Sequence, residues 1–171
     1  RYLFKQYGPQ HWWPAETPFE VMVGAILTQS AAWQNVEKAI YNLKAAGVLS
    51  PEKLRVMPVP EIARLIRPSG YYNAKARKLQ AMTTWLYDSC RDDISRLQNY
   101  RTEELRKSLL TVHGIGPETA DSILLYAVGK PVFVIDTYTR RIFSRLGITP
   151  VKDTYSEWQN LLTSGLPENV P

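Results

Sequence analysis

The stretch Leu109–Ala120, LLTVHGIGPETA, carries two glycines and a proline at the spacing of a tight turn between two helices. It predicts a helix over 102–111, a Gly-Ile-Gly turn at 114–116 and a second helix over 117–128 that begins with proline. Glycine permits positive φ and close approach of the backbone to another molecule. The amides of 114–118 would then point outward from a helix N-terminus, which favours an anion such as a DNA phosphate. An ordinary helix–helix connection with glycine as C-cap explains the same residues.

Helices are also predicted along the rest of the chain. Thr17 and Pro18 are suited to the N-cap and first position of a helix, and the apolar run Phe19–Thr28 that follows predicts a buried central helix. Further helices are expected over 33–46, in short form after Pro51 and Pro60, and over 73–90, 137–146 and 153–164. The fold class predicted is therefore all-α with short connections.

Two segments qualify this helical pattern. Between residues 73 and 90 the apolar side chains recur at helical spacing, and Lys75, Arg77 and Lys78 fall off the apolar stripe. The run Val132–Ile135 has the composition of a strand, but it is four residues long and has no partner. We therefore expect it to be an extended loop.

Composition narrows the class of protein. The chain has 171 residues, enough for one ordinary domain or two small lobes that share a cleft, with 44% hydrophobic and 22% charged residues, as in globular proteins. No apolar run approaches the roughly 20 residues that span a bilayer, so no membrane partner is expected. Cys90 is the only cysteine, which excludes a disulfide framework and favours the reducing cytoplasm. The net charge of +5 suits a polyanionic partner, and ten Tyr and five Trp could stack on bases or pack in the core.

Asp136 lies between the apolar run and the next predicted helix. An aspartate there is a natural N-cap. The same position presents a carboxylate from the semi-rigid end of a helix, and the two roles are compatible.

Four segments together resemble one family. Val112–Asp121 and Pro131–Asp136 are similar to the helix-hairpin-helix, Gly/Pro-rich loop and catalytic aspartate of the endonuclease III superfamily of DNA glycosylases, also called HhH-GPD. Val23–Ser30 resembles the buried helix and following loop of that family. Gly70–Ala76 resembles its glycine-leucine-tyrosine-asparagine-x-lysine-alanine segment. The matches keep the family's order over roughly residues 17–148, which is far more specific than any one of them.

The resemblance implies two helical lobes with a cleft between them, into which a damaged nucleotide is rotated from duplex DNA. The expected divisions are an N-terminal segment with a lobe-linking helix over 1–30, a six-helix barrel-like lobe over 31–135 that includes the hairpin at 102–128, and the catalytic aspartate with the start of the second lobe over 136–171.

The resemblance also implies the site residues. Asp136 would be the catalytic carboxylate, and Gln29 would fill the gap left by the extruded base. The expected DNA-binding residues are Gly114, Ile115, Gly116, Glu118, Thr119 and Gln29. Carbonyl oxygens of Leu110, Val112 and Ile115 would hold a monovalent cation, K⁺ or Na⁺, as in some relatives.

One departure from the family pattern bears on the reaction. Bifunctional relatives carry a lysine two residues after the second glycine of the hairpin, where it forms a Schiff base with the sugar, and here that position is Glu118. A carboxylate cannot form an imine, so lyase chemistry through this residue is excluded. Asp136 could still stabilise the positive charge that develops on the sugar and orient or deprotonate the water. The sequence thus predicts a monofunctional glycosylase.

The predicted base pocket resembles the 3-methyladenine glycosylase branch. Trp12, Trp13 and Pro14, followed by Trp33, match positions where aromatic rings sandwich the extruded base. Indole faces attract a cationic alkylated purine by about 0.5–2 kcal/mol each. The tryptophans could instead pack in the core. Alternatives in function are a glycosylase for oxidised pyrimidines or mismatched thymine, or a non-catalytic helix-hairpin-helix module.

Partners and cofactors follow from the same resemblance. The expected partner is double-stranded DNA with a damaged base, bound by a monomer in the cytoplasm, associated with the nucleoid in a prokaryote. Many relatives end in four cysteines that hold an iron–sulfur cluster. These residues do not support such a cluster, and no cofactor is expected to be required within this chain; a cluster would need a further C-terminal segment.

Overall fold

A computed structural model describes residues 2–10 and 13–165. Every regular element of these residues is helical, and no strand occurs among them, which confirms the all-α class. The elements are α1 (Tyr2–Tyr7), α2 (Pro18–Leu27), α3 (Trp33–Ala45), α4 (Pro51–Val56), α5 (Val59–Leu65), η1 (Arg67–Ser69), α6 (Tyr72–Cys90), η2 (Ile94–Asn99), α7 (Thr102–Leu110), α8 (Pro117–Ser122), η3 (Ile123–Val128), α9 (Thr137–Arg145) and α10 (Tyr155–Thr163).

Helix α2 is the centre of the larger lobe. It begins as its sequence predicts, because Thr17 Oγ1 accepts a hydrogen bond from Glu20 N at 3.1 Å and Pro18 occupies the first helical position. Every residue from Phe19 to Leu27 is buried. The helix packs against α3, α6, α8 and η3, so nearly its whole circumference is apolar.

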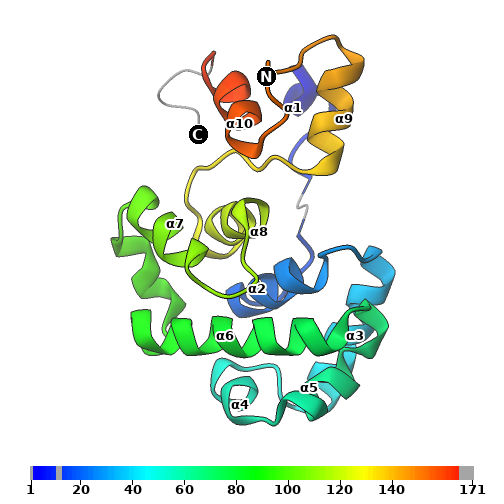
Figure 1. Ribbon diagram of the computed structural model, residues 1–171, viewed down its shortest axis with the longest axis vertical. Coiled ribbons are helices and arrows are strands. Elements are labelled where there is room, and N and C mark those ends of the chain that lie inside the picture. Colours follow the sequence, from blue (N-terminus) through cyan, green and yellow to red (C-terminus); the bar gives the residue numbers. More distant parts are fainter. Residues whose placement is uncertain (1, 11–12, 166–171) are drawn as a thin grey trace.

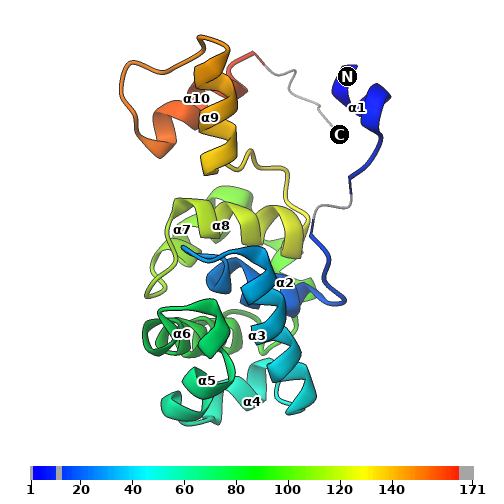
Figure 2. The same cartoon turned by 90° about the vertical axis from the view of Figure 1, so that its right-hand side faces the viewer.

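The molecule has two lobes of unequal size. Figure 1 shows α3–α6 at one end, α2, α7 and α8 in the middle, and α9 with α10 at the other end. The same three levels are seen in the perpendicular view of Figure 2. The extended segment at 129–136 connects the larger lobe to α9, and its lack of regular structure confirms that Val132–Ile135 is a loop. The predicted residue divisions of the lobes stay a prediction.

The structure corrects one prediction about α6. Lys75 was expected outside the buried stripe, yet only 1% of it is exposed. Its ammonium donates to the carbonyl oxygens of Leu27 at 2.9 Å and Ser69 at 2.7 Å, which are the last residues of α2 and η1. These carbonyl oxygens make burial of the charged ammonium group tolerable, and the spacing of the apolar residues alone does not predict their presence. Burial lowers the pKa of Lys75 to about 8, with a further contribution from Lys78.

Candidate active site

The hairpin between α7 and α8 forms as its sequence predicts. Gly114 has a φ of +84°, and Ile115 N donates to Val112 O at 3.1 Å, which closes the turn. A Cβ at Gly114 would overlap the aliphatic stem of Lys78, so both the backbone angle and the space require glycine. Gly116 is different, because its backbone is extended and a Cβ there would meet nothing within 4 Å. Its open side is available to a partner.

Gln29 connects the end of α2 to this hairpin. Its Nε2 donates to Gly114 O and to Thr119 Oγ1, both at 3.0 Å, and its Oε1 accepts from Lys78 Nζ at 2.5 Å. The Thr119 hydroxyl therefore faces Gln29 rather than solvent, and Ile115 is buried. The amide of Gln29 holds the loop after α2 against the turn. Its role in filling a gap in DNA stays a prediction.

Asp136 is the N-cap of α9. Its Oδ1 accepts a hydrogen bond from Thr139 N at 2.6 Å, as the sequence pattern predicts. The residue is half-buried and lines a cavity of about 990 Å³ that opens between the lobes. The cap fixes the direction of the carboxylate, because one oxygen is held by the backbone of its own helix.

The cavity collects residues that lie far apart in the sequence. Its described lining consists of Trp13, Pro14, Ala25, Thr28, Gln29, Ser30, Ala31, Ala32, Trp33, Glu118, Thr119, Ser122, Tyr126, Val134, Asp136, Thr137, Tyr138 and Thr139. The predicted catalytic residue, the hairpin residues Glu118 and Thr119, and the predicted base-pocket residues Trp13, Pro14 and Trp33 are thus brought together. Trp12 lies outside the described residues.

Glu118 and Asp136 form a pair of neighbouring carboxylates in this cavity. Burial raises the pKa of Glu118 above its usual value, and the negative charge of Asp136 raises it further, while Arg140 lowers it. The two groups therefore differ in environment: Asp136 accepts a backbone hydrogen bond, whereas the raised pKa of Glu118 reflects a site that disfavours its charged form.

An aromatic wall forms the side of the cavity next to α2. The rings of Trp13 and Trp33 meet edge to face at 5.9 Å between centroids, and Trp13 lies 5.3 Å from Tyr126. The indole of Trp13 packs on Gly24, where a Cβ would come within 3.1 Å of the ring. Tyr126 was not predicted as a site residue. Burial, followed by the charge of Asp136, raises the pKa of its hydroxyl.

The predicted cation site has only partial support in geometry. Its carbonyl groups at Leu110, Val112 and Ile115 belong to the hairpin, and Val112 O already accepts from Ile115 N, with one lone pair left for a cation. In the described part of the chain no cluster of three His, Cys, Asp or Glu residues could hold a metal. The described helices likewise include none with the length and hydropathy of a membrane span.

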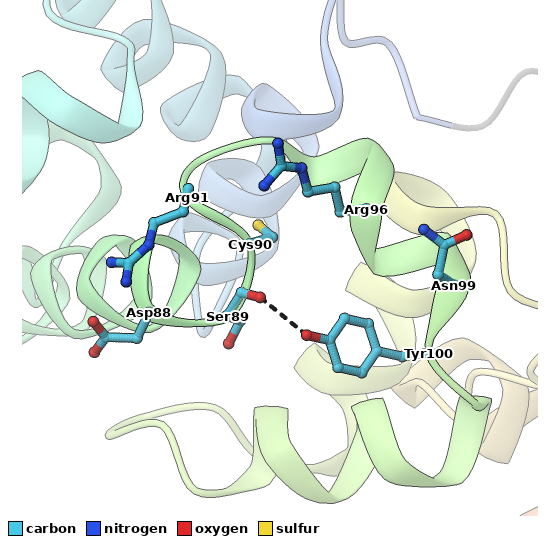
Figure 3. Close-up of a pocket in the computed structure, with 7 residues that line it drawn as sticks. All are labelled: Asp88, Ser89, Cys90, Arg91, Arg96, Asn99 and Tyr100. Atoms are coloured by element: carbon cyan, nitrogen blue, oxygen red, sulfur yellow. Dashed lines mark hydrogen bonds between the residues drawn. The ribbon is translucent and has the colours of Figure 1, made fainter.

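A second cavity of about 600 Å³ lies where α6 ends, away from the predicted site residues (Figure 3). Tyr100 Oη donates to Ser89 O across it at 3.0 Å. Its arginines are engaged, since Arg96 pairs with Asp93 at 3.1 Å and Arg91 stacks on a tyrosine ring. Among the described residues, none that lines this cavity has a buried side-chain polar atom without a hydrogen-bond partner.

A helix-hairpin-helix whose second helix lines a cleft that also contains a capping aspartate is the arrangement of a class of DNA repair enzymes. The chain matches the family described as HhH-GPD superfamily base excision DNA repair protein over residues 23–168, and it belongs to that family. It is therefore a base excision DNA repair glycosylase of the endonuclease III type that acts on DNA.

Particular relatives agree with this membership. A Methanocaldococcus jannaschii protein described as a candidate DNA repair glycosylase is 44% identical over 98% of this chain and 77% of its own length. The 3-methyladenine DNA glycosylase of H. pylori, solved bound to 1,N6-ethenoadenine, is 33% identical with a TM-score of 0.83, over 95% of this chain and 75% of that one. A solved non-covalent endonuclease III–DNA complex has the same fold at 24% identity and a TM-score of 0.81, over 97% of this chain and 74% of that chain.

Proposed function

We propose that this chain hydrolyses the N-glycosidic bond of an alkylated purine in duplex DNA and leaves an intact abasic site. The observation that carries the proposal is the shared cavity of the two lobes, which is lined both by Asp136 and Glu118 and by the aromatic wall of Trp13, Trp33 and Tyr126. A cation-attracting wall suits a base with positive charge. An alkylated purine is also a good leaving group, so strong acid catalysis is not required.

The reaction needs a carboxylate near the sugar. As the glycosidic bond loosens, positive charge develops on the sugar, and Asp136 would stabilise that charge through space. The Oδ2 atom is the one left for this purpose, because Oδ1 is held by Thr139 N. The same oxygen would orient or deprotonate the water that adds to the sugar. The amides around Gly114 and Gly116 would hold the neighbouring phosphate.

Glu118 supports the monofunctional part of the proposal. It occupies the place of the lysine that forms a Schiff base in bifunctional relatives, and none of the described residues that line the cavity is a lysine. The ammonium of Lys75 is buried against two carbonyl groups, and that of Lys78 binds Gln29. Glu118, whose pKa is raised by burial and by Asp136, would lie beside the extruded base in the same cavity.

The relatives support the choice of base without deciding it. The H. pylori protein is by its name a 3-methyladenine DNA glycosylase, whereas other relatives are named endonuclease III. For this chain we infer specificity for an alkylated purine such as 3-methyladenine, on the basis of the tryptophans that line its cavity. We also infer a monomer that acts in the cytoplasm.

A panel of damaged duplexes tests the specificity. We expect the release of free base from methylated DNA to exceed that from thymine glycol by at least about tenfold, because indole faces favour a cationic base. Equal or reversed rates would remove the alkylation assignment. No base released from any lesion would argue against the enzyme itself.

Asp136 is tested by two substitutions that separate its roles. Asp136→Asn keeps an oxygen for Thr139 N but removes the charge, so we expect an unchanged melting temperature and the loss of all but a residual rate of base release. Asp136→Ala should lose base release as well and about 0.5–2 kcal/mol of stability with the cap. A fully active Asp136→Asn variant would contradict the catalytic assignment.

The monofunctional claim is tested by borohydride reduction during turnover. We expect no covalent adduct between the protein and DNA, because a carboxylate at position 118 forms no imine. A trapped species with the mass of protein plus DNA would contradict the claim.

A further inference from the structure

Asp121 of α8 is a fully buried carboxylate with four hydrogen-bond donors around it. Arg106 Nε donates to Oδ1 at 2.6 Å, and Arg106 Nη2 donates to Oδ2 at 3.1 Å. Tyr155 Oη and Gln159 Nε2 donate to Oδ2 at 2.8 and 2.9 Å. Asp121 is 0% exposed, and charge pairing with several hydrogen bonds is what makes a buried carboxylate tolerable. The cluster joins α7, α8 and α10.

The same cluster holds the loop that ends at Asp136. Tyr155 Oη accepts from Ile135 N at 3.2 Å, one residue before the carboxylate. Gln159 Nε2 donates to Phe133 O at 2.8 Å. Burial raises the pKa of the Tyr155 hydroxyl, so this group keeps its proton for Asp121 at every physiological pH. The loop is therefore fixed at two backbone atoms, on both sides of Val134.

Packing of α9 cannot replace these contacts. No residue of α9 is buried, although Asp136 is its N-cap. The helix is tied by Arg140, which pairs with Asp153 at 2.8 Å, and Asp153 precedes α10 in the same lobe. The position of Asp136 relative to the hairpin therefore depends on its loop, which is held by the buried side chain of Ile135 and by the hydrogen bonds to Tyr155 and Gln159 of α10.

We propose that Tyr155 and Gln159, anchored on Asp121, are positioning residues that hold Asp136 in place in the cavity. This inference rests on the proposed role of Asp136 in base release. The hydroxyl of Tyr155 connects Asp121 of α8 to Ile135 N through hydrogen bonds, and Gln159 connects Asp121 to Phe133 O in the same way. A loop freed from these contacts would let the carboxylate drift, and a misplacement of about 1 Å reduces a rate by about 100-fold.

The test is Tyr155→Phe, which removes the relaying hydroxyl and keeps the ring. Tyr100→Phe is the matched control, because it also removes one hydroxyl donor, the one to Ser89 O in the remote cavity of Figure 3. For each protein we would measure the single-turnover rate of base release from methylated duplex DNA and the Kd for a duplex with an abasic-site analogue. We expect Tyr155→Phe to slow release about 10- to 100-fold with Kd within about threefold, and Tyr100→Phe to match the wild type.

A double-variant cycle separates positioning from general destabilisation. If Tyr155 acts through Asp136, then Tyr155→Phe should slow the residual reaction of Asp136→Asn by less than about twofold. The same loss in both backgrounds, or a wild-type rate for Tyr155→Phe, would overturn the inference. Should Tyr155→Phe fail to fold, Gln159→Met removes the other arm of the relay and undergoes the same cycle.

The two proposals fail in different ways. Full activity of Asp136→Asn refutes the proposed catalytic role. An inactive Asp136→Asn together with a wild-type rate for Tyr155→Phe and for Gln159→Met refutes only the positioning of Asp136.

Discussion

Substitution of Gly114 by alanine should damage the hairpin before any DNA is bound. The glycine has a φ of +84°, and a Cβ would overlap the stem of Lys78. Lys78 cannot move freely, because its ammonium binds Gln29, which in turn binds the carbonyl of Gly114. The strain should therefore spread to the loop after α2.

The size of the effect follows from two contributions. A non-glycine residue at positive φ costs about 1–2 kcal/mol. Forcing extra volume into a packed place costs about 1–3 kcal/mol more. In a protein of this length each kcal/mol lowers the melting temperature by about 2–4 °C, so Gly114→Ala should melt about 4–20 °C below the wild type.

Gly116→Ala is the control within the same turn. Its backbone is extended, and its Cβ would meet nothing within 4 Å, so the melting temperature should change by no more than about 2 °C. If the open side of Gly116 faces a phosphate, this variant should nevertheless bind abasic-analogue DNA more weakly. Calorimetry and fluorescence anisotropy measure the two quantities on the same samples.

Shortening Lys78 tests the steric part directly. In the double variant Lys78→Ala/Gly114→Ala, the side-chain atoms that would overlap the new Cβ at position 114 are absent. Only the cost of positive φ and the lost contact of Lys78 with Gln29 remain. The double variant should therefore be less destabilised than the two separate losses predict. Equal melting temperatures for Gly114→Ala and the wild type would refute the reasoning, as would strictly additive losses in the double variant.

Three further substitutions test the charges. Glu118→Gln should raise the melting temperature at pH 7 but not at about pH 3. The pKa of Glu118 is raised on folding, so its ionisation makes the folded protein less stable as the pH rises above the pKa of the unfolded state, and glutamine cannot ionise. Glu118→Lys should yield a borohydride-trapped adduct with DNA that disappears when Asp136→Asn is added, and failure to trap it would mean that position 118 does not reach the sugar. Lys75→Met should lose about 2–5 kcal/mol in urea unfolding, because the carbonyl groups of Leu27 and Ser69 lose their donor. The wild type, with the pKa of Lys75 lowered to about 8 from 10.5, should gain stability between these pH values, and the variant should not.

Local signals in the sequence were sufficient where the cause of the structure is local. Thr17 and Pro18 begin α2, Gly114 takes the positive φ of the turn, and Asp136 caps α9, each through atoms within a few residues. The helix predicted over 117–128 exists, but its second half, η3, is a π-helix. The resemblance then supplied what single motifs could not, namely that these signals belong to one cleft.

Contacts between distant segments were not predicted from the sequence. Tyr126 faces the cavity in the π-helical half, whose hydrogen-bonding pattern is not evident from the residues ILLYAV. Lys75 is buried because two helix ends supply carbonyl groups that only the folded chain brings together. The role of Asp121 likewise depends on α10, more than thirty residues further along. Short helix α1 (Tyr2–Tyr7) was also missed, because it is only six residues long and has no acidic residue in its first turn, although Gly8 at a φ of +67° follows it.

Helix α8 contacts several of the elements that form the candidate site. In six residues it presents Glu118 and Ser122 to the cavity, Thr119 to Gln29, and Asp121 to the cluster that holds the loop of Asp136. Consecutive side chains on a helix point in different directions, so one short helix can contact all three neighbours. The turn that would hold a phosphate leads directly into α8, and the cluster that holds the loop of Asp136 includes Asp121 of the same helix. The positions of the phosphate and of the Asp136 carboxylate would therefore both depend on α8. The distance between them is then set by α8 and its contacts rather than by the exposed helix α9.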